Sequence, residues 1–152
     1  MSKKPTWDEY FMELAKVVTK RANCLRAHYG ALIVKDYRLI STGYNGTPHG
    51  IKNCEEGGCE RCRRRANGEI QTHEFQESCI CIHAEQNAII QAAYLGTSTK
   101  EATMYSTVSP CSSCAKLIIN AGIVRYVYAT PHHDGNGIRL LQEAGIEVRQ
   151  FV

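Results

Sequence analysis

The chain has 152 residues, 43% of them hydrophobic and 22% charged, with a formal net charge of +3. This composition is typical of one globular domain with a proper core, and the mild charge permits an anionic substrate without requiring nucleic acid. No stretch approaches the roughly twenty apolar residues of a membrane span, and the start of the chain leads into no apolar signal core. We therefore expect a single cytoplasmic domain over residues 1–152, with neither a membrane nor a nucleic-acid partner.

The first third of the chain predicts a helix and a hairpin. A capping box begins at Thr6, and the apolar stripe that follows predicts a helix to about Ala22. Residues 31–34 and 38–42 are strand-like runs around a short turn, which is typical of a β-hairpin. A Gly- and Pro-rich loop, 43–50, leaves the second strand.

The last 70 residues alternate between helical and strand patterns. The expected elements are helices at 84–93, 112–121 and 138–144, and strands at 103–108, 124–129 and 146–151. Together with the hairpin they predict an α/β fold, with helices covering a mixed sheet of about five strands. Strands separated by single helices should be parallel.

Residues 51–82 form a Cys-rich insertion without apolar periodicity. This insertion contains Cys54, Cys59, Cys62, Cys79 and Cys81, together with the basic run 61–65. A segment of this kind would not become ordered through hydrophobic burial alone. In a reducing compartment, eight cysteines indicate metal binding rather than disulfides.

Two short clusters stand at the starts of two predicted helices. His83-Ala84-Glu85 precedes the first, and Pro110-Cys111-Ser112-Ser113-Cys114 precedes the second. Helix N-termini favour thiolates, which are the form that zinc binds. His83, Cys111 and Cys114 would leave the fourth position of a zinc ion open, as in catalytic sites, and Glu85 could handle the protons of a water there. A closed structural zinc knuckle and a redox Cys pair are the alternatives.

His-x-Glu followed by Pro-Cys-x-x-Cys is the known signature of zinc-dependent nucleobase deaminases. With the run 43–46, the Cys-rich insertion and residues 115–123, the chain resembles the cytidine deaminase superfamily, and within it the deoxycytidylate (dCMP) deaminases. The resemblance implies a three-layer α/β/α fold and hydrolysis of dCMP to dUMP and ammonia, which supplies dUMP for thymidylate synthesis. It also implies a homo-oligomer, with a hexamer favoured, and dCTP and dTTP as effectors in many members.

Within this chemistry, zinc would lower the pKa of a water to about 7, and Glu85 would carry its proton to N3 of the base and then to ammonia. The resemblance places Asn45 against the nucleotide. The candidates for the phosphate are Arg26, Lys52, the run 61–65, His132 and His133.

The resemblance also implies a second, structural zinc. Alignment to dCMP deaminases of the phage type puts Cys24, Cys54, His73 and Cys81 at its ligand positions. This chain departs from that type by adding Cys59, Cys62 and Cys79, so the ligand set can instead draw on these residues.

Rival functions are other deaminations within the superfamily, of tRNA adenosine, free cytidine or a riboflavin-pathway pyrimidine. A zinc-stabilised nucleic-acid-binding module, with the basic run 61–65 as its footprint, is a rival of a different class. Against that module, no aromatic residues interleave with the basic run to stack bases.

Overall fold

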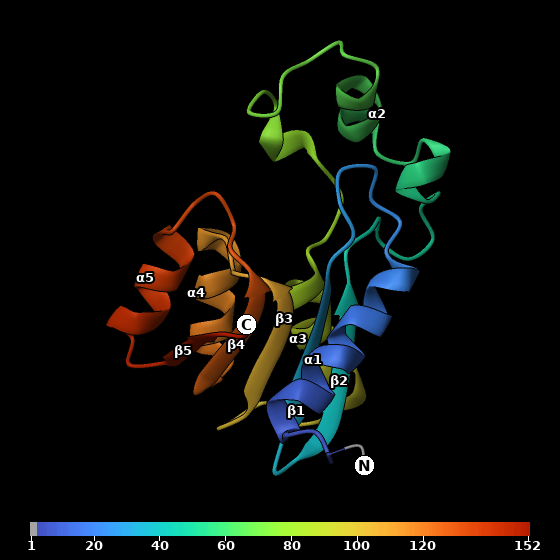
Figure 1. Ribbon diagram of the computed structural model, residues 1–152. Coiled ribbons are helices and arrows are strands. Elements are labelled where there is room, and N and C mark those ends of the chain that lie inside the picture. The colour runs from blue at the N-terminus through green and yellow to red at the C-terminus, as the bar shows by residue number, and fades with distance from the viewer. Residues whose placement is uncertain (1–2) are drawn as a thin grey trace.

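A five-stranded mixed sheet organises the molecule, in the order β2-β1-β3-β4-β5. Its strands are β1 (Gly30–Lys35), β2 (Arg38–Tyr44), β3 (Thr103–Val108), β4 (Arg125–Thr130) and β5 (Glu147–Gln150). β1 pairs antiparallel with β2 and β3, whereas β3, β4 and β5 run parallel. This computed structural model, which describes residues 3–152, confirms the predicted sheet and the parallel strands joined by single helices (Figure 1).

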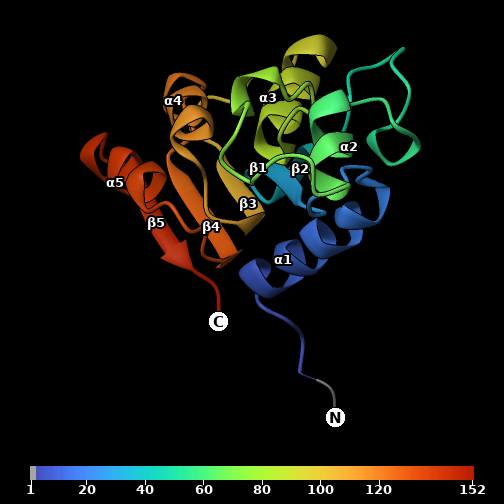
Figure 2. The same ribbon diagram turned by 90° about the horizontal axis from the view of Figure 1, so that it is seen from above.

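Helices cover both faces of the sheet. They are α1 (Trp7–Val18), α2 (Glu60–Ala66), α3 (Ala84–Leu95), α4 (Ser112–Asn120) and α5 (Asn136–Glu143), with 3₁₀ turns at Thr19–Arg21, Cys54–Glu56 and Gln76–Ser78. Helix α1 lies on one face, and α3, α4 and α5 lie on the other (Figure 2). The three-layer α/β/α architecture is thereby confirmed. Within residues 3–152, no helix is both long and apolar enough to cross a membrane.

The predicted capping box starts α1. Thr6 N–H donates to Glu9 Oε2 at 2.6 Å, and Glu9 N–H donates to Thr6 Oγ1 at 3.2 Å. The α-helix ends at Val18 rather than near Ala22, because the chain tightens there into a 3₁₀ turn. The buried side chains of α1 pack on β1, β3 and β4: Phe11, Met12 and Ala15 against Leu32, Val34, Tyr105 and Val127.

The opposite face holds the larger part of the core, where α3 lies very close to the hairpin. Gly43 in β2 makes this approach possible, because a Cβ there would stand 2.1 Å from Ala84 O and 2.3 Å from Ala88 N. Ala84 and Ala88 are themselves buried and small. The close contact fixes the first turns of α3 against the sheet.

The Cys-rich insertion lies beyond the end of the sheet at which α3 begins (Figure 1). As predicted, it has no amphipathic stripe, but it contains the short helix α2, which its apolar pattern does not predict. An isolated antiparallel bridge between Gly46 and Ile82 joins its end to the loop after β2. The insertion therefore returns the chain directly to His83 and α3.

Candidate active site and metal centres

His83, Cys111 and Cys114 meet at one point, as predicted from their positions. His83 is the N-cap of α3 and Cys111 is the N-cap of α4, so the two helix N-termini converge. His83 Nδ1 lies 3.3 Å from Cys114 Sγ and 3.5 Å from Cys111 Sγ. Cys114 N–H donates to Cys111 Sγ at 3.5 Å.

These distances fit a shared zinc ion. Bond lengths of about 2.3 Å to sulfur and 2.0–2.1 Å to nitrogen in a tetrahedron put the two kinds of ligand atom about 3.6 Å apart. The thiol of Cys114 and the imidazole of His83, both hydrogen-bonded to Cys111, lower the pKa of Cys111 to about 3, which favours the thiolate that zinc requires. Three ligand atoms come together here, and they leave a fourth position for another group.

Glu85 stands in the first turn of α3 with 3% of its surface exposed. Its Oε1 lies 3.2 Å from the Tyr126 hydroxyl and 3.4 Å from Ser106 Oγ, and its Oε2 lies 3.7 Å from Cys114 Sγ. Burial raises the pKa of Glu85, because the charged carboxylate loses its hydration. A carboxyl group with a raised pKa, placed next to the metal ligands, is suited to accept and return protons near neutral pH.

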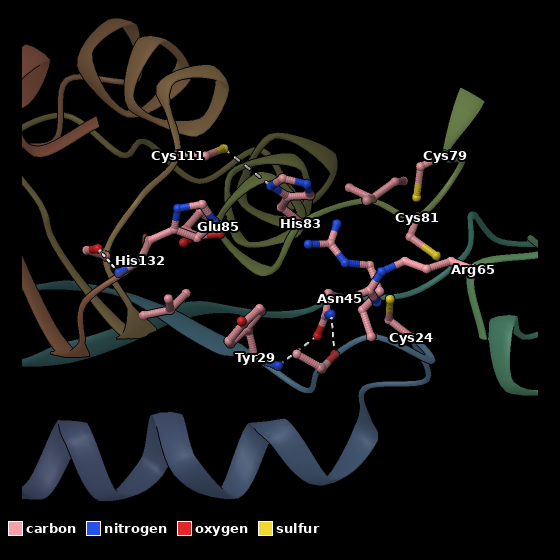
Figure 3. A pocket seen from close by; sticks show the side chains of 15 residues that line it. Cys24, Tyr29, Asn45, Arg65, Cys79, Cys81, His83, Glu85, Cys111 and His132 are labelled. Atoms are coloured by element: carbon pink, nitrogen blue, oxygen red, sulfur yellow. Dashed lines mark hydrogen bonds between the residues drawn. The ribbon is translucent and has the colours of Figure 1, made fainter. Parts of the chain in front are cut away.

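A pocket of about 240 Å³ opens in front of these residues (Figure 3). Residues from segments far apart in the sequence line it: Cys24, Arg26, Ala27, Tyr29, Asn45, Arg65, Cys79, Cys81, Ile82, His83, Glu85, Val108, Ser109, Cys111 and His132. Of the predicted phosphate partners, the structure brings Arg26, Arg65 and His132 to this pocket. Lys52 and His133 are not among its lining residues.

Asn45 lines the pocket, but its amide is already used by the protein. Its Oδ1 accepts from Tyr29 N–H at 2.7 Å, and its Nδ2 donates to Ala27 O at 2.7 Å. These bonds hold the loop before β1 at the pocket wall. One N–H of the amide and one lone pair of Oδ1 remain for a ligand, so a substrate contact for Asn45 stays a prediction.

The remaining six cysteines form two overlapping groups beside the pocket. Cys24, Cys54, Cys62 and Cys81 make one group, and Cys59, Cys62, Cys79 and Cys81 make the other. Three members of the predicted set Cys24, Cys54, His73 and Cys81 therefore come together. His73 does not join them, because it lies exposed in the loop after α2, and Cys62 takes its place because α2 turns this side chain inward to 1% exposure.

The sequence did not single out Ser106 and Tyr126, the two hydroxyl partners of Glu85. Both lie in runs with an ordinary strand pattern, and only the inward direction of their side chains in β3 and β4 brings them to Glu85. Tyr126 is fully buried, and its hydroxyl also lies 2.8 Å from Val108 O. A polar side chain on the buried face of a strand would have been the one available signal.

The three-layer fold, with a histidine and two cysteines at converging helix N-termini, defines a class of zinc-binding domains. The family model for the cytidine and deoxycytidylate deaminase zinc-binding region matches residues 5–130, and the chain belongs to this family.

Two fungal proteins named deoxycytidylate deaminase are each 40% identical to it: that of Schizosaccharomyces pombe over 98% of this chain, and that of Saccharomyces cerevisiae over 97%. The chain spans 45% and 46% of their lengths, about half of each. Among solved structures, the dCMP deaminase of cyanophage S-TIM5 in complex with dCMP and dUMP superposes with a TM-score of 0.79 at 30% identity. That match covers 99% of this chain and 100% of the phage chain.

Proposed function

We propose that this chain hydrolyses dCMP to dUMP and ammonia with zinc held by His83, Cys111 and Cys114. The observation that carries the proposal is the buried Glu85 carboxyl group beside the three converging ligand atoms, at the inner end of a pocket with two arginines in its wall. The fungal relatives named deoxycytidylate deaminase and the phage structure with dCMP and dUMP support this substrate.

Zinc, when bound, would supply a Lewis acid at the position left open by the three ligands. Glu85 would transfer the protons, as the general base and then the general acid. In its ionised form it would accept a proton from the attacking water and deliver it to N3 of the cytosine ring, so that C4 becomes electrophilic. The hydroxide left from the water would add to C4. Glu85 would then carry the proton of the new C4 hydroxyl to the amino group, so that the C–N bond breaks, ammonia leaves and C4 becomes the carbonyl of dUMP. Its raised pKa suits both steps, because the group must accept and release a proton in each cycle.

We assign the phosphate of the substrate to the guanidinium groups of Arg26 and Arg65. Both line the pocket, where Arg65 lies on the side away from Glu85 (Figure 3). Arg65 also bonds Thr72 Oγ1 at 3.3 Å, which limits its mobility. Charge-assisted, bidentate arginine contacts suit a phosphate monoester. This assignment would favour dCMP over free cytidine.

The basic run 61–65 gives little support to a nucleic-acid-binding function. Arg61 is buried, with 2% of its surface exposed. Arg63 pairs with Glu60 at 2.6 Å and with Glu69 at 3.5 Å, and Arg64 pairs with Glu69 at 3.4 Å. Since most of this positive charge is buried or already paired, only Arg65 is directed towards a ligand site.

We propose the outer surface of α3 as an interface of a homo-oligomer. Ile90, Tyr94 and Leu95 are 53%, 87% and 61% exposed there, an apolar group that a second copy of the chain could cover. The hexameric state and the response to dCTP and dTTP stay predictions. For metal content, we propose the catalytic zinc and further zinc in the Cys-rich insertion.

Ammonia release from a panel of substrates tests the proposal. The panel comprises dCMP, deoxycytidine, cytidine, dCTP and a tRNA anticodon stem, each incubated with the zinc-loaded chain. We expect dCMP to be turned over with the highest kcat/KM. Preferred turnover of the anticodon stem or of free cytidine would assign the chain to another branch of the superfamily.

A further inference from the structure

We propose that the Cys-rich insertion holds a binuclear zinc cluster, in which six cysteines bind two ions and Cys62 and Cys81 bridge them. One ion would be bound by Cys24, Cys54, Cys62 and Cys81, and the other by Cys59, Cys62, Cys79 and Cys81. The proposal concerns metal binding by the insertion, and it holds whether or not the chain deaminates dCMP.

The two overlapping groups carry the first argument. In each of them all four sulfur atoms lie within 4.8 Å of one another, and the groups share Cys62 and Cys81. Because a thiolate sulfur has three lone pairs, it can be bound to two metal ions at once. Two tetrahedral sites that share two ligands need six thiolates, which is the number present.

The measured sulfur–sulfur distances fit tetrahedral coordination. Cys79 Sγ lies 3.7 Å from Cys62 Sγ and 3.8 Å from Cys59 Sγ. Zinc–sulfur bonds of about 2.3 Å in a tetrahedron place neighbouring sulfurs about 3.8 Å apart. All eight cysteines are free, so these sulfurs are in contact without being bonded to one another.

Cysteines make up most of the buried interior of the insertion, beside Ile70 and Arg61. Cys24, Cys54, Cys59 and Cys62 form a separate buried cluster against which Cys79 and Cys81 pack, and no aliphatic or aromatic residue belongs to it within residues 3–152. Six thiols bury too little apolar surface to order about thirty residues. Metal–thiolate bonds can supply the missing free energy, as they do in small zinc domains.

A single ion would leave two of the six cysteines without a function. With zinc on the first group alone, Cys59 would remain a thiol at 0% exposure, close to the Cys79 sulfur. With zinc on the second group alone, Cys24 and Cys54 would remain unbound, although both are buried and Leu25 N–H already donates to Cys54 Sγ at 3.4 Å. Two ions use all six sulfurs.

The charge of Arg61 agrees with such a cluster. Six thiolates and two Zn²⁺ ions carry a net charge of −2, from six negative and four positive charges. Arg61 precedes Cys62 in α2, is 2% exposed, and makes no ion pair with a carboxylate in the described part of the chain. Its Nε donates to Glu74 O at 3.2 Å and its Nη2 to Thr72 O and, at 3.1 Å, to Glu74 O, whereas its Nη1 is buried without a hydrogen-bond partner. A buried guanidinium group is costly unless hydrogen bonds and nearby negative charge offset its lost hydration, and Arg61 is directly followed in α2 by the proposed ligand Cys62.

The metal content of the whole chain tests the proposal. The chain is purified under reducing conditions, dialysed against metal-free buffer and measured by elemental analysis and native mass spectrometry. We expect three zinc ions per chain, and two in the Cys111→Ser/Cys114→Ser double variant, which lacks the catalytic ligands. This variant separates the cluster from the deamination proposal. A value of one or zero in the double variant, or iron in place of zinc, would overturn the binuclear assignment.

Bridging is tested on the double variant loaded with ¹¹³Cd. We expect two ¹¹³Cd resonances split by coupling through the shared sulfurs, whereas two uncoupled resonances would contradict shared ligands. Two single variants test the same point. Cys59→Ser removes a ligand of one ion and should lose that ion, whereas Cys62→Ser removes a bridging ligand and should lose both ions. Equal losses from the two variants would show that Cys62 does not bridge. If Cys59→Ser or Cys62→Ser fails to fold, the ¹¹³Cd measurement still tests bridging, because it uses a chain in which all six cysteines of the cluster are intact.

Discussion

The hydroxyl of Tyr126 in β4 lies between Glu85 Oε1, at 3.2 Å, and Val108 O, at 2.8 Å. It carries one proton for two acceptors. When Glu85 is ionised, the hydroxyl can donate to the carboxylate; when Glu85 is protonated, the hydroxyl can donate to Val108 O and accept from the carboxyl group. One buried group therefore serves both protonation states of the proposed general base.

Removing this hydroxyl should slow turnover without removing zinc. In Tyr126→Phe, we expect kcat to fall by about tenfold, because a rate factor of this size corresponds to the free energy of one hydrogen bond to a charged group. The hydroxyl lowers the pKa of Glu85 by donating to its charged form, so its loss raises that pKa further. Because the base must be ionised to accept a proton, the acidic limb of the kcat/KM profile should move to higher pH. A pH–rate profile checks this shift.

Tyr128→Phe is the control for this change, because Tyr128 lies two residues along the same strand and its hydroxyl is not a partner of Glu85. The control should keep the wild-type profile. An unshifted profile in Tyr126→Phe would show that the hydroxyl does not act on the base.

The phosphate assignment predicts a substrate-dependent effect of Arg65→Gln. We expect KM for dCMP to rise about tenfold or more, because a charge-assisted contact is lost, while turnover of deoxycytidine stays unchanged. Steady-state kinetics on both substrates measure this difference. Arg64→Gln is the matched control, because Arg64 pairs with Glu69 and is not a lining residue of the pocket. An equal effect on both substrates would remove Arg65 from phosphate binding.

The close contact between β2 and α3 predicts that Gly43→Ala destabilises the fold. A Cβ at this position would clash with backbone atoms of Ala84 and Ala88, which cannot move without shifting α3. We expect a loss of about 2 kcal/mol or more in the free energy of unfolding, measured by urea denaturation. Gly135→Ala should have little effect, because nothing lies within 4 Å of the added carbon and φ is −77°. Equal stability of the two variants would contradict this packing.

An ion pair between α1 and the sheet predicts a pH-dependent stability. Arg125 Nη1 and Nη2 bind the two carboxylate oxygens of Asp8 at 2.8 and 2.7 Å. The hydrogen bonds from Arg125, assisted by the Tyr105 hydroxyl, lower the pKa of Asp8 to about 2 from its ordinary value of 3.8. Because the folded pKa is the lower one, the ion pair contributes its full stability above pH 3.8. This contribution is lost as the pH falls towards 2.

In Asp8→Asn we expect a loss of about 1–2 kcal/mol at pH 7, after allowance for partial solvent screening, and no further difference from wild type near pH 2. Urea denaturation at several pH values measures both. Glu147→Gln removes an exposed partner of the same arginine, at 3.3 Å, and should cost less than about 0.5 kcal/mol. A constant Asp8→Asn effect from pH 7 to pH 2 would contradict the titration.

Local patterns were sufficient to predict most of the fold and that His83, Cys111 and Cys114 come together. The capping box at Thr6 and the alternation of helix and strand after His83 depend on neighbouring residues, and both were confirmed. Helix α2 was not predicted, because its inward face carries Cys62 and Arg61 rather than an apolar stripe. Its side chains bond the loop that follows it, Arg61 to Glu74 O and Arg65 to Thr72 Oγ1.

Two contacts could not be predicted for a related reason: that Cys62, rather than His73, lies with Cys24, Cys54 and Cys81, and that Tyr126 lies against Glu85. His73 was assigned by alignment to relatives of the phage type, and sequence order does not show that α2 brings Cys62 to the same place. Tyr126 meets Glu85 only after β4 pairs beside β3 and α3 packs on β1 and β2, which sets the position of its first turn. Contacts between residues 41 positions apart need the assembled sheet.

The central claim is that Glu85 moves the protons of dCMP deamination beside a bound zinc ion. The most direct measurement compares zinc content and dUMP formation in wild type and Glu85→Gln, at equal protein concentration. We expect the variant to keep its zinc and its fold and to lose at least about 10³-fold in kcat, because an amide cannot accept the proton. A zinc-loaded Glu85→Gln variant that forms dUMP at the wild-type rate would contradict the account.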